Sequence, residues 1–231
     1  MCGVTEMLLA VFLLTDLMLA AASRLLHCIR VVVAQGILLG ILPLVMWDFQ
    51  VSPPHGKMIF VAVVNVMVKG VVLPYLLNRA MRQANVRREL EPYVGYGMSL
   101  GIVLLLIAGS FYFAGQLEMP ESSVAKFSTP VAFTTMLTGL FLVISRRKAL
   151  TQVIGFLIFE NGISIFGTGL MLEYGLLVEL GILLDVLVLV FVVGIVLFQI
   201  NREFDHIDSD RLNALADTGV VMEQNKREEE E

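Results

Sequence analysis

Long apolar runs separated by short polar stretches dominate this sequence. Seven of them are about as long as the roughly 20 residues that a helix needs to cross a bilayer. They lie at 4–22, 31–48, 58–77, 94–115, 129–145, 150–172 and 176–200. No run alternates with the period of two that is typical of a barrel strand, so each predicts a helix. The pattern predicts an all-α integral membrane protein with about seven transmembrane helices.

Composition agrees with a membrane protein and argues against a catalytic one. Of the 231 residues, 57% are hydrophobic and 16% are charged, and the mean hydropathy is +0.82. Cys2 and Cys28 are the only cysteines, fewer than the four thiolates that an iron–sulfur cluster needs. No nucleophile elbow, paired zinc-binding histidines or phosphate-binding glycine loop is present. We therefore expect no cofactor, no metal, no catalytic residue and no nucleic-acid partner, with the lipid bilayer as solvent.

Basic residues in the short loops predict an orientation. They follow the first, third and fifth runs: Arg24, Arg30, Arg79, Arg82, Arg87, Arg88, Arg146, Arg147 and Lys148. Because Lys and Arg collect in cytoplasmic loops, the N-terminus is expected outside and the C-terminus in the cytoplasm. The first run has no basic region before it, so we interpret it as a retained helix rather than a cleaved signal.

Three segments are expected along the chain. The basic loop at 79–92 separates a three-helix segment (1–92) from a four-helix segment (93–200). Residues 201–231 hold ten of the 21 acidic residues and four of the 16 basic ones, and so account for the negative net charge. Such a block is usually a solvated, disordered tail, with a short docking helix at 208–216 as the alternative.

Three ionisable residues lie deep inside predicted spans. Lys69 is eleven residues into the third run, Glu160 about ten into the sixth and Asp185 about nine into the seventh. At about 1.5 Å per residue, all three fall roughly 13–17 Å from a membrane face, near the midplane. Glu6 and Asp16 lie nearer the ends of the first run, and the sequence leaves a functional and a structural role equally open for them.

A charge at the midplane costs about 2.5–3.5 kcal/mol or more, so a functional role is the default for Lys69, Glu160 and Asp185. Carboxylates and a lysine at one depth can exchange protons at small cost. A hard cation prefers six or more oxygens, and Lys69 would repel it. The alternative is a structural ion pair that fixes the order of the helices, although such pairs rarely add net stability.

The neighbours of these residues support the interpretation. On the sixth run a polar stripe at four-residue spacing comprises Gln152, Glu160, Ser164 and Thr168. Asn161 points about 100° away from Glu160 and is expected to bond a neighbouring helix. Close helix packing or local deformation is expected at Gly155, Gly162, Gly167 and Gly169. On the third run Asn65 lies one turn from Lys69, and Pro74 removes the hydrogen bond to the Gly70 carbonyl.

Three stretches are similar to a known family. SRRKALTQVIGFLIFENGISIFGTGL (145–170) and LLVELGILLDVLVLVFVVGIVL (176–197) resemble component E of group 4 membrane-bound hydrogenases of the formate hydrogenlyase or hydrogenase-4 type. VNVMVKGVVLPYLLNRAMR (64–82) resembles that family's lysine-and-proline helix. The last three helices are also similar to the K subunit of respiratory complex I and to its small counterpart in multisubunit cation/proton antiporters.

The resemblance implies a non-redox subunit in the membrane arm of an energy-converting, complex I-related complex of the prokaryotic cytoplasmic (inner) membrane. Its neighbours would be antiporter-like membrane proteins and a protein similar to the H subunit of complex I, with hydrogenase and iron–sulfur subunits on the cytoplasmic side. The chain would not be catalytic by itself. Alternatives are a structural subunit that only aligns antiporter-like subunits, and a subunit of a cation/proton antiporter without a redox module.

The resemblance also implies site residues. Glu160 matches the glutamate of the complex I K subunit and Lys69 the component E lysine, while Glu179 and Asp185 match that family's V-E-x-G and x-D pattern. Asp185 departs from the K subunit, in which the second acid falls about one turn later. We expect Glu160 to be the central carboxyl of a proton relay, Asp185 its partner, Lys69 a modulating or passing group and Glu179 an entry or exit group.

Overall fold

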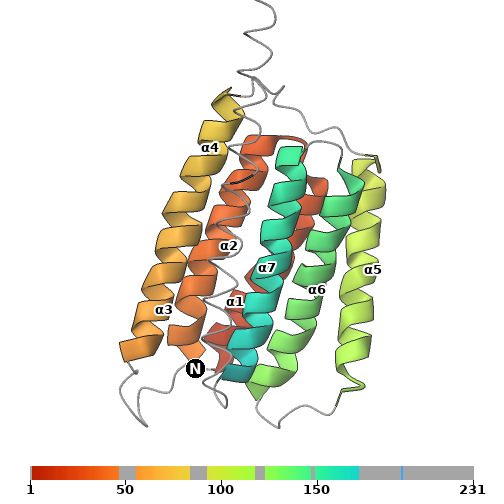
Figure 1. The fold of residues 1–231 in the computed structure, drawn as a ribbon. Helices are drawn as coiled ribbons and strands as arrows, with labels where there is room; N and C mark the ends of the chain where they lie inside the picture. The colour runs from red at the N-terminus through yellow and green to blue at the C-terminus, as the bar shows by residue number, and fades with distance from the viewer. Residues whose placement is uncertain are drawn as a thin grey trace, which may run out of the picture.

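The fold is a bundle of helices lying side by side (Figure 1). This computed structural model describes residues 2–46, 56–83, 93–117, 123–146, 149–171 and 194. The described helices are α1 (Cys2–Ala21), α2 (Leu25–Met46), α3 (Gly56–Met67), a π-helical turn η1 (Val68–Val72), α4 (Leu73–Gln83), α5 (Tyr96–Ala114), α6 (Ser123–Ser145) and α7 (Ala149–Met171). The all-α prediction is confirmed for these residues.

Six of the seven predicted runs coincide with described helices, and the third run becomes α3, η1 and α4 in succession. The seventh run (176–200) and the acidic tail (201–231) lie outside the described residues. Two helices begin six residues earlier than the apolar pattern predicted, α2 at Leu25 and α6 at Ser123. Their first turns carry polar residues, which an apolar window excludes but which a helix end can present to water.

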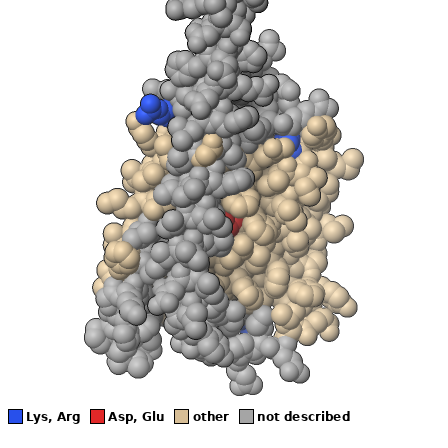
Figure 2. Space-filling model, in the orientation of Figure 1, with Lys and Arg blue, Asp and Glu red and all other residues tan. Residues whose placement is uncertain are grey.

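Within the described ranges, four helices are long and apolar enough to cross a membrane: Gly3–Ala21, Leu25–Met46, Tyr96–Ala114 and Lys126–Ser145. The chain is therefore a multi-pass membrane protein. α7 has 23 residues, which is enough to span a membrane. Unlike these four helices, it also carries the polar residues Glu160, Ser164 and Thr168 along one face. On the face drawn in Figure 2 the described atoms are mostly uncharged, basic atoms lie towards the ends of the bundle, and a small acidic patch lies at mid-height.

α6 and α7 pack against each other most closely, at glycines. A Cβ added to Gly162 would lie 2.5 Å from the Met136 nitrogen, and one added to Gly155 would lie 2.7 Å from the Val143 nitrogen. Because such distances are below van der Waals contact, only glycine allows this approach. Gly169 is similarly close to Ser128, whereas no atom of the described residues lies within 4 Å of a Cβ at Gly167. The expected close packing is therefore found at three of the four glycines.

Buried polar side chains, together with the half-buried Ser164, form a layer between two apolar clusters. One cluster includes Leu19, Val32, Leu142 and Ile158, and the other includes Phe12, Leu39, Ala132 and Ile165. On α1, α2, α6 and α7 alike, the polar positions fall between the members of the two clusters. We call this set the polar layer: Thr15, Asp16, Gln35, Lys69, Thr135, Glu160, Asn161 and Ser164.

Candidate functional site

Lys69 lies on the π-helical turn that interrupts the third predicted span. The backbone N–H of Leu73 donates to the carbonyl of Val68, five residues back rather than four. Pro74 follows immediately, and because it has no N–H it cannot continue the normal α-helical hydrogen bonds. Wide turns of this kind are frequent at functional sites. The turn lies directly before the proline that the sequence had marked beside Lys69.

A glycine on α2 allows Lys69 to approach the centre of the bundle. A Cβ added to Gly36 would lie 2.6 Å from the Lys69 Cβ, so a larger residue would push η1 away from α2. The Lys69 side chain is only 5% exposed. Its ammonium group is therefore held inside the bundle.

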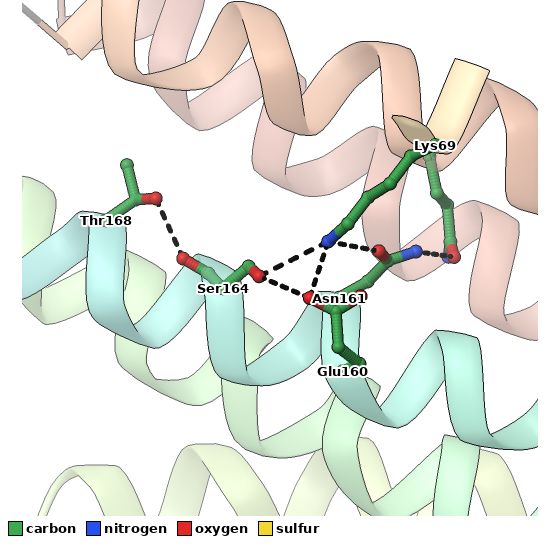
Figure 3. Close-up of polar contacts among 6 residues, drawn as sticks. Lys69, Glu160, Asn161, Ser164 and Thr168 are labelled. Carbon is green, nitrogen blue, oxygen red and sulfur yellow. Dashed lines mark hydrogen bonds and ion pairs between the residues drawn. The ribbon is translucent and has the colours of Figure 1, made fainter. Parts of the chain in front are cut away.

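The Lys69 ammonium group binds three oxygens of α7. Nζ lies 2.6 Å from Oε1 of Glu160, 3.2 Å from Oδ1 of Asn161 and 3.3 Å from Oγ of Ser164 (Figure 3). Ser164 Oγ donates in turn to Glu160 Oε1 at 2.9 Å, and Thr168 Oγ1 donates to the Ser164 carbonyl at 2.8 Å. The polar face of α7 that the sequence indicated thus faces Lys69.

Asn161 connects this ion pair to α2. Its Oδ1 accepts from Lys69, and its Nδ2 donates to Oε1 of Gln35 at 3.3 Å. The prediction that Asn161 bonds a neighbouring helix is confirmed. The positive charge of Lys69 fixes which end of the amide faces it, because an NH₂ group there would be repelled.

The hydrogen bonds continue from α2 to α1 and α6. Gln35 Nε2 donates to Thr15 Oγ1 at 2.9 Å and to Asp16 Oδ1 at 2.9 Å. Thr135 Oγ1 donates to the other carboxylate oxygen, Asp16 Oδ2, at 2.8 Å. One chain of buried hydrogen bonds therefore joins η1, α7, α2, α1 and α6.

Sequence reasoning missed Gln35, Thr15 and Thr135, and it left Asp16 without a role. The signal that could have found them is an uncharged polar residue deep in an apolar run, such as Gln35 in the middle of VVVAQGILLG. Attention to charged residues alone passes over these amides and hydroxyls, although they must also be paired when buried.

The remaining predicted residues lie apart from the ion pair or outside the described part. Gln152 is exposed near the start of α7, where Nε2 donates to the Arg146 carbonyl at 3.1 Å, so the stripe does not continue to it. Asn65 lies on α3, and its side chain is outside the described part. Pro74 is partly buried on α4. Asp185 and Glu179 lie outside the described residues.

Arg146, expected in a basic loop, is buried at one end of the bundle with 2% of its surface exposed. Its Nη2 donates to the Ala20 carbonyl at 3.4 Å, and its guanidinium carbon lies 5.8 Å from the centre of the Tyr96 ring. Burial lowers the pKa of Arg146 from its ordinary value. This residue ties the ends of α1 and α5 to α6 and is not part of the polar layer.

Comparison with known proteins gives one informative relative. No family model matches the chain, and no solved structure matches it. A protein of Mycobacterium tuberculosis (strain ATCC 25618 / H37Rv), named "Uncharacterized protein Rv0085", is 32% identical over 196 residues, which are 82% of this chain and 85% of that protein. The chain belongs to the Rv0085 family. The match covers most of both proteins, and the relative is bacterial.

The chemistry available to this Rv0085-family protein is that of a buried ion pair. A hydrogen bond of 2.6 Å between an ammonium and a carboxylate is at the short end for charged partners. Moving its proton from Nζ to Oε1 converts two buried charges into two neutral groups. Because neutral groups are much easier to separate in an apolar interior, the protonation state of the pair and the contact between η1 and α7 depend on each other.

Proposed function

We propose that this chain is a non-redox membrane-arm subunit of an energy-converting, complex I-related hydrogenase complex, in which the Lys69–Glu160 pair takes part in a proton relay. The sequence resemblance to hydrogenase component E supplies the type of complex. The observation that carries the relay is the 2.6 Å contact between Lys69 and Glu160, with both side chains at most 5% exposed.

The surroundings of the pair suit proton movement. Asn161 and Ser164 hold the ammonium group from two further directions, so the lysine keeps hydrogen-bond acceptors when Glu160 gains a proton. The π turn carries Lys69 on a segment whose hydrogen bonds differ from those of the helix on either side. A change of register between π and α turns would move Lys69 relative to α7, which would make and break the relay.

The full proposal extends to the predicted partners and orientation. Seven spans, an outer N-terminus and a cytoplasmic C-terminus would place the tail beside the hydrogenase and iron–sulfur subunits in a prokaryotic inner membrane. Antiporter-like proteins and a protein similar to the H subunit of complex I would flank the bundle, where α5 presents exposed apolar side chains including Met98, Leu105 and Tyr112. Asp185 would continue the relay from Glu160, and Glu179 would connect it to the outer face.

A purely structural subunit is the second candidate. The glycine contacts between α6 and α7 favour it, since such contacts alone align helices in lipid. Because those same contacts make a buried ion pair unnecessary for alignment, a structural role leaves Lys69 and Glu160 unexplained. The relay gives both residues a function. The antiporter-subunit alternative shares the proton chemistry and differs in its partners. Neighbouring genes for hydrogenase and ferredoxin-like subunits would favour the hydrogenase complex over an antiporter.

Glu160→Gln in the intact complex tests the relay. The amide keeps the size of the side chain but cannot release and rebind a proton. We expect redox turnover to continue while ion pumping falls, with Glu6→Gln as the matched control because Glu6 is exposed on α1. Full coupling in Glu160→Gln, together with normal assembly, would favour the structural candidate.

A further inference from the structure

Asp16 is a second buried carboxyl group, on a different helix from Glu160. It lies in the fourth turn of α1 with 0% of its surface exposed. Both of its oxygens accept hydrogen bonds, Oδ1 from Gln35 and Oδ2 from Thr135. Both donors are uncharged, so no cation touches Asp16 through these bonds. A permanently ionised carboxylate in such a place is costly.

Thr135 can satisfy Asp16 in either protonation state. Its hydroxyl has a single proton and two acceptors, Asp16 Oδ2 at 2.8 Å and the Val131 carbonyl at 3.0 Å. When Asp16 is ionised, the hydroxyl donates to Oδ2. When Asp16 carries a proton on Oδ2, that O–H donates to Thr135, and Thr135 donates to Val131. Only hydrogen atoms change position between the two states.

Two amides connect Asp16 to Lys69 in a fixed direction. Lys69 faces the oxygen of Asn161, the nitrogen of Asn161 faces the oxygen of Gln35, and the nitrogen of Gln35 faces Asp16. Both amide dipoles thus point their positive ends towards Asp16. Amides conduct no proton without an unfavourable tautomer, so this connection transmits polarisation between the two carboxyl sites.

The described helices packed around Asp16 carry no other charged side chain at its level. α5 carries Tyr96 and Tyr112 near its ends and no acidic or basic residue. α6 carries Lys126 in its first turn, nine residues before Thr135. The ionisable residues of α2, which are His27, Cys28 and Arg30, lie in its first two turns. Along the described helices, the charges that are hydrogen-bonded into the same network are those of Lys69 and Glu160.

We propose that Asp16 is a second proton-binding site of the polar layer, coupled through Gln35 and Asn161 to the Lys69–Glu160 pair. With one ammonium and two carboxyl groups, the layer is neutral when one carboxyl holds a proton. A proton from water binds Asp16 Oδ2 while Glu160 is ionised. When Glu160 takes a proton from water while Lys69 stays an ammonium group, the unbalanced charge of Lys69 and the two amide dipoles favour release of the Asp16 proton to water. This coupling rests on the proposed proton relay and adds Asp16 to it.

Infrared spectroscopy on the full chain in lipid vesicles tests the site directly, by the difference between spectra in which the carboxyl group is protonated and spectra in which it is ionised. Incorporation of carboxyl-labelled ¹³C-aspartate should shift the C=O band of a protonated carboxyl group, and Asp16→Asn should abolish the band. Asp217→Asn, an aspartate of the acidic tail, is the matched control and should leave the band unchanged. An unshifted band after labelling, or one that persists in Asp16→Asn, would overturn the proposal.

Thr135→Val covers the case in which Asp16→Asn does not fold. It keeps the carboxyl group and the side-chain shape but removes the hydroxyl, so the labelled band should move in frequency. An unmoved band would count against Asp16 as its source.

The two proposals fail separately. Impaired pumping in Glu160→Gln without an Asp16 band would retain the relay and remove Asp16 from it. An Asp16 band with normal pumping in Glu160→Gln would retain the proton site and remove the relay.

Discussion

The energetic coupling between Lys69 and Glu160 gives the sharpest stability prediction. Glu160→Leu leaves the Lys69 ammonium group buried without its carboxylate partner. Lys69→Met leaves the Glu160 carboxylate buried without its ammonium partner. Removing one member of a buried pair typically costs about 3–5 kcal/mol. The two side chains are only 5% and 1% exposed, so solvent screens the attraction between their charges only weakly.

The double variant Lys69→Met/Glu160→Leu should be far less destabilised than the sum of the single variants. Apolar residues of similar size in place of a buried pair are often neutral or stabilising by about 1–4 kcal/mol. We therefore expect a strongly non-additive double-mutant cycle, since residues in contact couple and distant ones do not.

Equilibrium unfolding in mixed micelles, followed by circular dichroism, measures this cycle. Lys126→Met is the matched control, because Lys126 is exposed on α6 and an exposed substitution changes stability by about 0.5 kcal/mol or less. Additive effects of Lys69→Met and Glu160→Leu would refute the reasoning, since they would mean that the two side chains do not interact in the folded protein.

Three further predictions concern the backbone that supports the pair. Gly162→Val should separate α6 from α7 and lower the unfolding temperature, because its Cβ would meet the Met136 nitrogen. Gly167→Ala should not, because no atom of the described helices lies within 4 Å of a Cβ at Gly167. Gly36→Ala should displace η1 and reduce pumping more than redox turnover, measured side by side in the complex. Pro74→Ala should allow normal α-helical hydrogen bonds and loosen the Lys69–Glu160 contact, visible as loss of a cysteine crosslink engineered between η1 and α7.

Much of the fold could be predicted because lipid imposes simple rules. Backbone groups have no water partners in the membrane, so a long apolar run must be a helix. This rule located α1 to α7, and helix depth at about 1.5 Å per residue placed Lys69 and Glu160 at one level, where they are found in contact. The beginnings of α2 and α6 were less predictable, because a helix can extend past the apolar run that reveals it.

The polar layer was only partly predictable from the sequence. Four-residue spacing revealed the face of α7 that carries Glu160 and Ser164, since spacing along one helix is a local property. Which residues of α1, α2 and α6 face this side of α7 depends on the order and rotation of the helices. The sequence pattern does not specify that order or rotation. For this reason the sequence did not predict that Gln35 and Thr135 belong to the polar layer, and it assigned Gln152 to a stripe that this residue does not join.

The number of protons moved per redox turnover by the Glu160→Gln complex, reconstituted in vesicles, tests the central claim most directly. The proposed relay predicts that this ratio falls well below that of the wild-type and Glu6→Gln complexes while electron transfer continues. A ratio equal to the wild type in a fully assembled Glu160→Gln complex would contradict it.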